Sequence, residues 1–380
     1  MTEKLYYTDA FWREFEATAL SCERVGDHFE IVLDRTAFFP EGGGQTGDSG
    51  KIGEAEIYDT KECGGEIRHW SKTAVNCGTS LSCRLDFEKR FERMQCHSGE
   101  HIVSGLFHKL YGLNNVGFHL GDDDVTIDLD GIPGETDIRK IEWLANETVA
   151  KNIPIRAFFP SKEEASAIEY RSKLEIAKGL RLVEIPGADI CACCAPHVGY
   201  TGQIGQIKLL DYAKYKGGLR LYMLAGVRAL RDYQEKYASV LKISNLLSAK
   251  QREVAEAVER LLLECGKRKK NETALRRALV GARLASLEPS DKNLVLFEPL
   301  CDPAALRALA DGAAEKCRLC AAFSGSDKDG YSYVVASRTE DLRAQARALN
   351  DALCGRGGGS PQMICGSVHT TRQKIEEYFR

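Results

Sequence analysis

The chain has 380 residues, more than one typical domain, and its 43% hydrophobic and 28% charged residues exclude a largely disordered protein. No stretch approaches about 18 uninterrupted apolar residues, and the first residues lack an apolar leader, so the sequence predicts neither a membrane span nor a secretory signal. The net charge of −3, taken over the whole chain, argues against a nucleic-acid partner. The 14 cysteines are then expected to be reduced thiols of a cytoplasmic protein, some of them metal ligands.

Residues 1–90 have the pattern of short strands separated by turns. The apolar stretch Glu30–Asp34 leads into the glycine cluster Gly42–Gly44, and Gly64–Gly65 marks a later turn. Further on, apolar and polar residues alternate with the period of a strand at Leu81, Cys83 and Leu85. We expect a small β-barrel or sandwich here.

Residues 91–225 mix helical and strand patterns and are expected to form an α+β domain. The clearest element is a helix predicted from Glu88 to Tyr111, because this stretch has no proline and its apolar residues recur at helical spacing. The fold class predicted for the whole chain is likewise α+β.

Residues 226–288 are expected to form a basic helical connector. Between Lys214 and Arg283 there are 17 Lys and Arg against 7 Asp and Glu, a local net charge of +10 that leaves −13 for the rest of the chain. Apolar residues recur there every three or four positions, which predicts one long helix or a helical hairpin. The basic face indicates contacts with RNA phosphates, or else an ordinary solvated face, and the apolar stripe indicates a homodimer.

Residues 289–380 alternate strand and helix patterns and are expected to be a compact α/β module. Strands are predicted over Asn293–Phe297 and Tyr331–Ala336, and helices over Ala304–Leu309 and Thr339–Leu353. The glycine-rich Gly355–Gly359 is expected to be a loop that joins a helix to a strand. For the pair of cysteines in this module, Cys317 and Cys320, we expect packing or solvent-facing thiols, since no second pair lies near them in the sequence.

Two histidine and cysteine pairs share a four-residue spacing. His97 and His101 lie on one face of the predicted helix, and Cys193 and His197 lie in a turn that contains a proline. Three imidazoles and a thiolate are a tetrahedral ligand set suited to zinc, so we predict one Zn²⁺ per chain. A lone histidine pair is usually an ordinary surface or core feature, and the choice of thiolate is left open by the neighbouring cysteines, Cys191 and Cys194.

These motifs resemble the editing domain of alanyl-tRNA synthetase. The resemblance rests on residues 97–101 with 193–197, on residues 34–45 with their three glycines and Gln45, on residues 201–205, and on residues 355–363. The last of these is similar to the DHH-associated domain at the end of the synthetase. The order is that of the family over nearly the whole chain, but there is no room for an aminoacylation domain, so the chain looks like a long free-standing editing protein.

The resemblance implies an N-terminal barrel, a zinc-containing editing domain, a helical connector and a C-terminal DHH-associated domain. It implies a zinc-dependent hydrolase that deacylates tRNA(Ala) mischarged with serine or glycine, without a membrane partner. By the same resemblance, Thr36 recognises the serine hydroxyl and Gln45 grips the amino acid or terminal adenosine. The backbone of Gly43 and Gly44 then approaches the substrate, and the tail glycines bind tRNA: Gly357, Gly358 and Gly359.

The chain departs from the family inside both metal motifs, at Ser98–Glu100 and at Cys194–Pro196, where the ligand spacing is nevertheless kept. Two rival functions stay open from the sequence. One is editing of a different tRNA, because the threonyl-tRNA synthetase editing domain has a similar metal motif. The other is an RNA-binding module whose zinc is purely structural.

Overall fold

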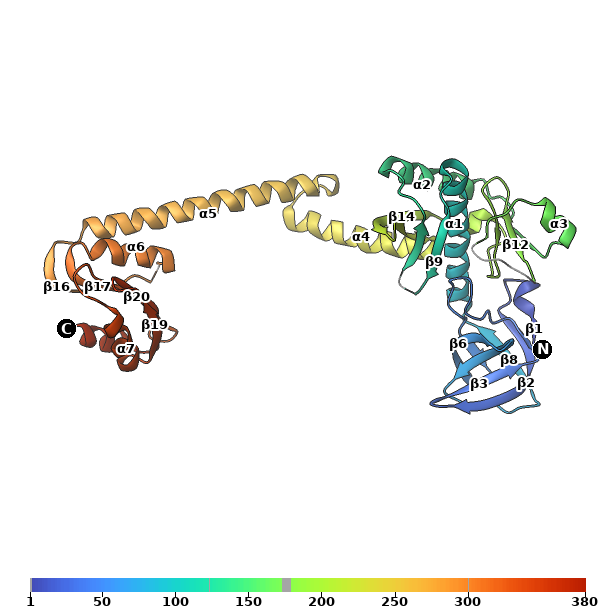
Figure 1. The fold of residues 1–380 in the computed structure, drawn as a ribbon, viewed down its shortest axis with the longest axis horizontal. Helices are drawn as coiled ribbons and strands as arrows, with labels where there is room; N and C mark the ends of the chain where they lie inside the picture. Colours follow the sequence, from blue (N-terminus) through green and yellow to red (C-terminus); the bar gives the residue numbers. More distant parts are fainter. Residues whose placement is uncertain (1, 123, 173–178, 300) are drawn as a thin grey trace. The chain divides into compact units, whose positions relative to one another are not determined.

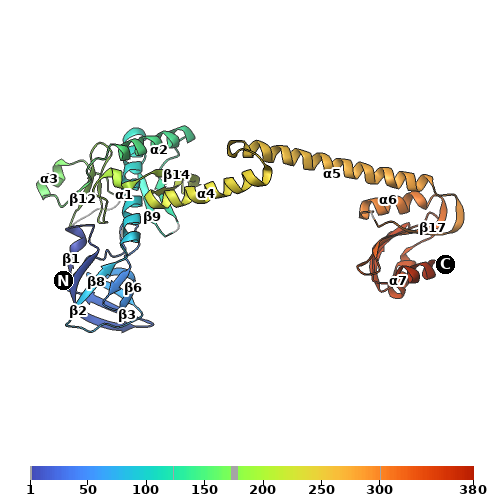
Figure 2. The same ribbon diagram turned by 180° about the vertical axis from the view of Figure 1, so that it is seen from behind.

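The computed structural model describes residues 2–122, 124–172, 179–299 and 301–380. The chain divides into two compact units, Met1–Leu241 and Lys242–Arg380, and both mix helices with sheets (Figures 1 and 2), which confirms the α+β prediction. No helix in the described ranges is both long and apolar enough to cross a membrane. All 14 cysteines are free thiols.

The N-terminal strands close into a barrel. Its order is β2-β3-β7-β6-β5-β8, formed by Glu14–Val25, His28–Leu33, Glu66–Ser71, Ala55–Cys63, Gly50–Ile52 and Ser80–Leu85. Alternate residues of these strands point inward, and the interior is filled by apolar side chains such as Phe15, Ile31 and Phe38. Beside the barrel, the short β1 (Glu3–Lys4) pairs in parallel with β4 (Arg35–Thr36).

Helix α1 (Phe87–Tyr111) leads from the barrel into the second part of the first unit (Figure 1). The side chain of Asp86 caps its first turn by accepting a hydrogen bond from the Lys89 N–H, and Gly112 ends it in a left-handed conformation with a φ of 67°. The helix packs on a four-stranded antiparallel sheet, β14-β15-β10-β9, together with α2 (Glu135–Ala150). These strands span Ile207–Tyr215, Gly218–Ala225, Val125–Leu129 and Asn115–Leu120.

A smaller antiparallel sheet in the same unit carries the second metal motif. Its strands β11, β12 and β13 are Arg156–Phe158, Leu182–Ile185 and Asp189–Ala192, and α3 (Lys162–Ala167) follows β11. Strand β13 packs against α1, so the loop after this strand begins close to the helix that carries the first metal motif.

The basic connector consists of two helices. Helix α4 (Gly226–Leu247) is followed by a 3₁₀ turn (Gln251–Glu253) and α5 (Val254–Ala285). Of the two predicted forms, one long helix or a helical hairpin, the structure excludes the first and has two helices joined by a short turn. The interruption begins at Ser248, whose φ of 49° is incompatible with a continuing right-handed helix.

The second unit ends in a five-stranded sheet ordered β16-β17-β18-β20-β19. These strands are Ser290–Phe297, Cys317–Ser326, Gly330–Ala336, Met363–Val368 and Gly355–Gly359, and the helices α6, α7 and α8 are Pro303–Ala313, Arg343–Ala352 and Arg372–Phe379. The prediction that Gly355–Gly359 is a loop is wrong, because these residues form the edge strand β19. A side chain would not fit at Gly357, whose Cβ would lie 2.8 Å from the Cα of Gly366 on the paired strand. Gly359 meets the backbone of β20 in the same way, whereas Gly358 faces open space.

Candidate metal centre

The structure brings the four predicted ligands together. His97 and His101 lie one turn apart on α1, and Cys193 and His197 lie in the loop that follows β13. The Cys193 Sγ is 3.5 Å from the Nε2 of His97 and 3.4 Å from the Nε2 of His197. One ligand atom from each of the four residues lies within 4.8 Å of all the others. This is the cluster that a tetrahedral metal ion requires.

Each imidazole has a hydrogen-bond partner on its other nitrogen. The Nδ1 atoms of His97 and His101 lie 3.0 Å from the Oε1 of Gln45 and 2.9 Å from the Oδ2 of Asp189. The Nδ1 of His197 lies 3.0 Å from the hydroxyl of Ser98, which also accepts the N–H of Val198. These partners hold the protons on Nδ1 and leave each Nε2 free to bind metal. The donor set therefore fits zinc in both its atoms and its supporting hydrogen bonds.

The charges in the cluster also suit a metal ion. Burial would raise the pKa of the Cys193 thiol, but the nearby imidazoles of His97 and His197 bring it well below its usual value. Burial lowers the pKa of His197 to about 3, which keeps this ring neutral. Burial would also lower the pKa of His101, but its hydrogen bonds to Asp189 and Cys193 raise it well above the usual value. A thiolate that is balanced by a proton on a neighbouring imidazole is ready to exchange that proton for a metal ion.

The other two cysteines of the loop have different surroundings. Burial raises the pKa of Cys191 and that of Cys194 to about 11, so both are protonated thiols at neutral pH. Cys191 does form a smaller cluster with His101 and Asp189, but Asp189 is already ion-paired with Arg171. The geometry therefore favours Cys193 as the thiolate ligand.

Asp189 and Ser98 hold the imidazoles of two candidate ligands, and sequence reasoning missed both. Asp189 accepts hydrogen bonds from Arg171 Nε at 2.7 Å and Nη2 at 2.8 Å, in addition to that from His101. The approach of Asp189 to α1 depends on Gly105, where a Cβ would lie 2.7 Å from the Cβ of Asp189. One signal was readable, because Asp189 and the motif cysteine Cys191 lie two residues apart on β13, and strand alternation directs both side chains to the same face.

A cavity of about 490 Å³ lies beside the ligand cluster. Its wall includes the metal-binding side chains of α1, the loop after β13, and two predicted substrate-binding glycines, Gly43 and Gly44. Gly44 has a φ of 82°, and a Cβ there would lie 2.8 Å from the ring of Phe118, so the loop comes this close only because it lacks a side chain. Gln45 is buried behind the loop, where it holds His97.

Thr36 lies on β4 beside the barrel, where it is buried against β7, and it is absent from the described wall of this cavity. The Nδ1 of His69 donates to the carbonyl of Ile31 at 2.9 Å, so its Nε2 accepts the hydroxyl proton of Thr36 at 2.8 Å. The Thr36 oxygen also accepts the N–H of Phe38 at 3.1 Å. The role of Thr36 in serine recognition therefore stays a prediction, and its contacts in the structure hold the barrel together.

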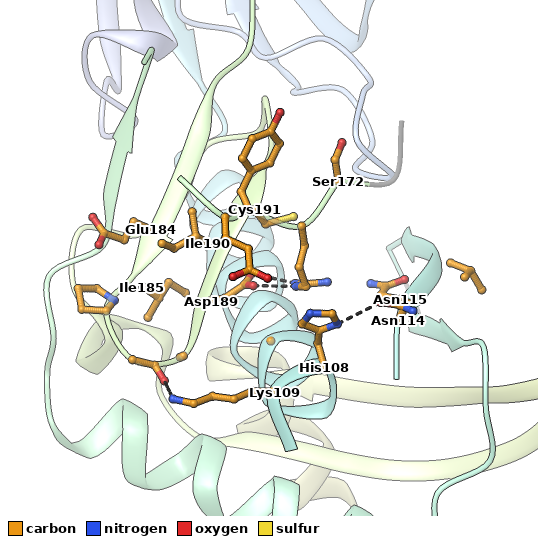
Figure 3. Close-up of a pocket in the computed structure, with 18 residues that line it drawn as sticks. His108, Lys109, Asn114, Asn115, Ser172, Glu184, Ile185, Asp189, Ile190 and Cys191 are labelled. Carbon is orange, nitrogen blue, oxygen red and sulfur yellow. Dashed lines mark hydrogen bonds and ion pairs between the residues drawn. The ribbon is translucent and has the colours of Figure 1, made fainter. Parts of the chain in front are cut away.

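A second hollow, of about 770 Å³, adjoins the first and shares four lining residues with it: Val116, Arg171, Ser172 and Cys191. Figure 3 shows His108 and Lys109 on one side of this hollow and the strand residues around Asp189 on the other. The His108 Nδ1 lies 3.0 Å from the side chain of Asn114, and the Lys109 amine donates to the Gly187 carbonyl at 3.0 Å. His108 therefore stands apart from the candidate ligand cluster.

This chain is similar to one family model over a short segment and to several known proteins along most of its length. Residues 180–222 match the Threonyl and Alanyl tRNA synthetase second additional domain, a segment that includes Cys193 and His197. The alanyl-tRNA editing protein AlaX-L of Pyrococcus horikoshii is 28% identical, with 99% of this chain and 96% of that protein covered. The alanyl-tRNA editing protein Aarsd1 of Rattus norvegicus is 26% identical, with 97% and 94% covered. The alanine–tRNA ligase of Natronomonas pharaonis is 30% identical over 94% of this chain but only 40% of its own length. Along nearly its whole length the chain thus resembles the free-standing alanyl-tRNA editing proteins, which confirms the resemblance carried by its motifs.

Proposed function

We propose that this protein is a trans-editing hydrolase that deacylates mischarged tRNA(Ala), chiefly Ser-tRNA(Ala) and also Gly-tRNA(Ala). The observation that carries the proposal is the cluster of three imidazoles and one thiolate within 4.8 Å, beside a cavity of about 490 Å³. The names of the full-length relatives, which are alanyl-tRNA editing proteins, support the substrate class.

The chemical need for such an enzyme follows from the size of the amino acids. A site shaped for alanine cannot strongly reject serine, because one added hydroxyl gives discrimination on the order of a hundredfold in a comparable case. Glycine is smaller than alanine and is not excluded by its shape. A second site that hydrolyses the wrong ester restores accuracy, and polar recognition of the serine hydroxyl discriminates far better than apolar fit.

In this proposal one Zn²⁺ is held by His97, His101, Cys193 and His197. When bound, zinc supplies positive charge that orients the acylated end of the tRNA and polarises its ester. Gln45 holds the His97 ring, and the open backbone at Gly43 and Gly44 admits the terminal nucleotide to the cavity. Thr36 is retained as the proposed partner of the serine hydroxyl.

The second unit and the connector are proposed to hold the tRNA body. Residues 226–285, which span α4 and α5, carry 14 Lys and Arg against 7 Asp and Glu, and this net charge of +7 supports phosphate contacts. The edge strand with Gly357, Gly358 and Gly359 is a further proposed contact, since Gly358 presents its backbone to open space. Exposed tyrosines and leucines on α4 and α5, among them Tyr233 and Leu275, support a homodimer through the connector. The protein is proposed to act in the cytoplasm.

One observation favours a second candidate, an RNA-binding module with a structural metal. Four protein ligands fill a tetrahedral shell, as in structural zinc sites.

Incubation of the protein with Ser-, Gly- and Ala-tRNA(Ala), with and without a chelator, separates the two functions. Loss of the seryl and glycyl esters but not of the alanyl ester, abolished by chelation and by Cys193→Ala, is expected of the editing enzyme. Tight tRNA binding without ester loss would refute it.

A further inference from the structure

A buried arginine forms part of the cavity wall beside the metal ligands. Arg181 precedes β12 and is only 6% exposed. Its Nη1 donates to two carbonyls of the metal-binding loop, those of Cys193 and Ala195, at 2.9 Å each. The guanidinium therefore lies against the loop that carries two of the four ligands, and it lines the same cavity of about 490 Å³.

In the part of the chain that the structure describes, the remaining donors of Arg181 have no acceptor, although its guanidinium lies over the ring of Tyr7, 5.3 Å from the ring centroid. Within the ranges that the structure describes, Nε and Nη2 form no hydrogen bond and no carboxylate pairs with this arginine. Arg171 on the same wall differs from Arg181, because its Nε and Nη2 both donate to the carboxylate of Asp189. The Tyr7 ring and the nearby Cys193 thiolate offset part of the cost of burying this cation, but Nε and Nη2 are left for a ligand to accept from.

The charges around Arg181 favour an anion in the cavity. Zinc bound to three neutral imidazoles and one thiolate carries a net charge of +1, and Arg181 adds a second positive charge. On the same wall, the carboxylate of Glu100 is engaged by Ser104 and Asn115, and that of Asp189 behind the wall is paired with Arg171. An oxygen that becomes negative during a reaction is therefore stabilised beside Arg181.

We infer that Arg181 donates hydrogen bonds to the carbonyl oxygen of the aminoacyl ester and stabilises the oxyanion that forms there; this inference rests on the proposed function. A water oxygen bonds to the carbonyl carbon, and the π electrons move to the carbonyl oxygen beside Nε and Nη2. The electrons then return, the bond to the ribose oxygen breaks, and that oxygen takes a proton from the water. The products are the free amino acid and tRNA with a free 3′-terminal ribose.

Two features favour the ester over a phosphate as the partner of Arg181. The acylated end is the terminus of the tRNA, so the group that reacts beside the ligand cluster in the proposed reaction is the ester and not a phosphodiester. Moreover, a metal with four protein ligands has a full tetrahedral shell. A further donor is therefore needed where the negative charge develops, and a preorganised guanidinium meets that need.

The test compares Arg181→Gln and Arg181→Lys with the matched control Arg156→Gln in the full-length, zinc-loaded protein. Arg156 is an exposed residue of β11 in the same small sheet and lies outside the cavity wall. With Ser-tRNA(Ala), kcat is expected to fall by about 10²–10³-fold in Arg181→Gln, with KM within about threefold of the wild type. Arg181→Lys is expected to retain part of this rate, and the control Arg156→Gln is expected to keep the wild-type rate. In a further variant, Arg181→Ala, added guanidinium is expected to restore turnover.

The possible results distinguish failure of the inference about Arg181 from failure of the proposed function. A raised KM with unchanged kcat would overturn the inference, because Arg181 would then anchor a phosphate. Unchanged kinetics would also overturn it, and so would loss of zinc in both Arg181→Gln and Arg181→Lys, since the arginine would then act by holding the loop. If the wild-type protein itself does not hydrolyse the ester, the proposed function fails, whatever the Arg181 variants do.

Discussion

The Nδ1 of His101 on α1 lies 2.9 Å from the Oδ2 of Asp189 on β13, a residue 88 positions further along the chain. Because Arg171 holds both oxygens of the same carboxylate, the acceptor is fixed in place before any metal binds. A carboxylate behind a ligating imidazole sets its tautomer and makes the free nitrogen more basic. The candidate metal centre thus depends on a chain of three residues, of which only His101 is a predicted ligand.

Replacing Asp189 with asparagine is expected to weaken zinc binding by about 10–100-fold, because the amide keeps the shape but lacks the charge that holds the His101 proton. Competition with a chromophoric zinc chelator measures the affinity. Glu184→Gln is the matched control, since it removes a carboxylate from the neighbouring strand β12, outside the ligand cluster. Equal zinc affinity in Asp189→Asn and in the control would show that the carboxylate has no such role.

The helix with the first ligand pair was predictable from local patterns. A helix over Glu88–Tyr111 was predicted, and α1 spans Phe87–Tyr111, because its apolar periodicity is uninterrupted and Gly112 gives a clear end. Helical geometry alone then directs His97 and His101 to one face. In the same way, the regular alternation in the first 90 residues indicated a β-rich domain.

Contacts between distant segments were not predictable. The meeting of Asp189 with His101, and that of Ser98 with His197, depends on how β13 and the following loop pack on α1, which no local pattern encodes. The glycine strand β19 was missed because glycine has a low preference for strands. It pairs with β20 because the glycines of both strands let the backbones approach and leave room for the ring of Tyr333.

Thr36→Val tests the hydroxyl that joins β4 to the barrel strand β7. The variant keeps the shape of the side chain but leaves the Nε2 of His69 without its donor, so the free energy of unfolding is expected to fall by about 1–3 kcal/mol. Urea unfolding measures this change. If Thr36 also recognises serine, the ratio of Ser-tRNA(Ala) to Gly-tRNA(Ala) deacylation falls in the same variant. An unchanged ratio would remove Thr36 from the substrate site and leave only its structural role.

The buried His69 predicts a pH dependence of stability. Burial lowers its pKa to about 4, although the hydrogen bond to Ile31 acts in the opposite direction. An unfolded histidine has a pKa of about 6.5, so between these values the unfolded chain binds a proton that the folded chain does not. The contribution of His69 to stability is therefore complete above about pH 6.5 and is lost as the pH falls toward about 4.

We expect the wild type to lose about 3 kcal/mol more than His69→Gln between about pH 7 and about pH 4. Urea unfolding at several pH values, followed by tryptophan fluorescence, measures the two curves. The comparison is between slopes, because the variant also loses the hydrogen bonds of the ring. Parallel curves would mean that His69 is not the titrating group.

The connector's cluster of exposed cations on α5, Lys267–Lys270, is expected to contact tRNA phosphates. Lys269→Gln combined with Lys270→Gln should weaken tRNA binding and lower the slope of log affinity against log salt by roughly one for each lost contact. The matched control changes two exposed barrel lysines, Lys51 and Lys72, to glutamine. Filter binding at several salt concentrations gives both slopes, and an equal effect in both variants would contradict a specific contact on α5.

Helix α5 also has two apolar faces with different surroundings. Val280 and Leu284 pack into the core of the C-terminal unit, whereas Leu275 and Leu279 are 71% and 47% exposed one helical turn apart. Exposed leucines at this spacing are typical of a helix that pairs with a second copy. If Leu275 and Leu279 pack against a second copy of α5, Leu275→Glu combined with Leu279→Glu converts the dimer to a monomer, because the double substitution places charges in the apolar interface. Asn271→Glu, which adds charge at an already polar position, leaves the dimer intact, and sedimentation equilibrium distinguishes the species. A wild-type protein that is monomeric at every concentration would exclude the interface.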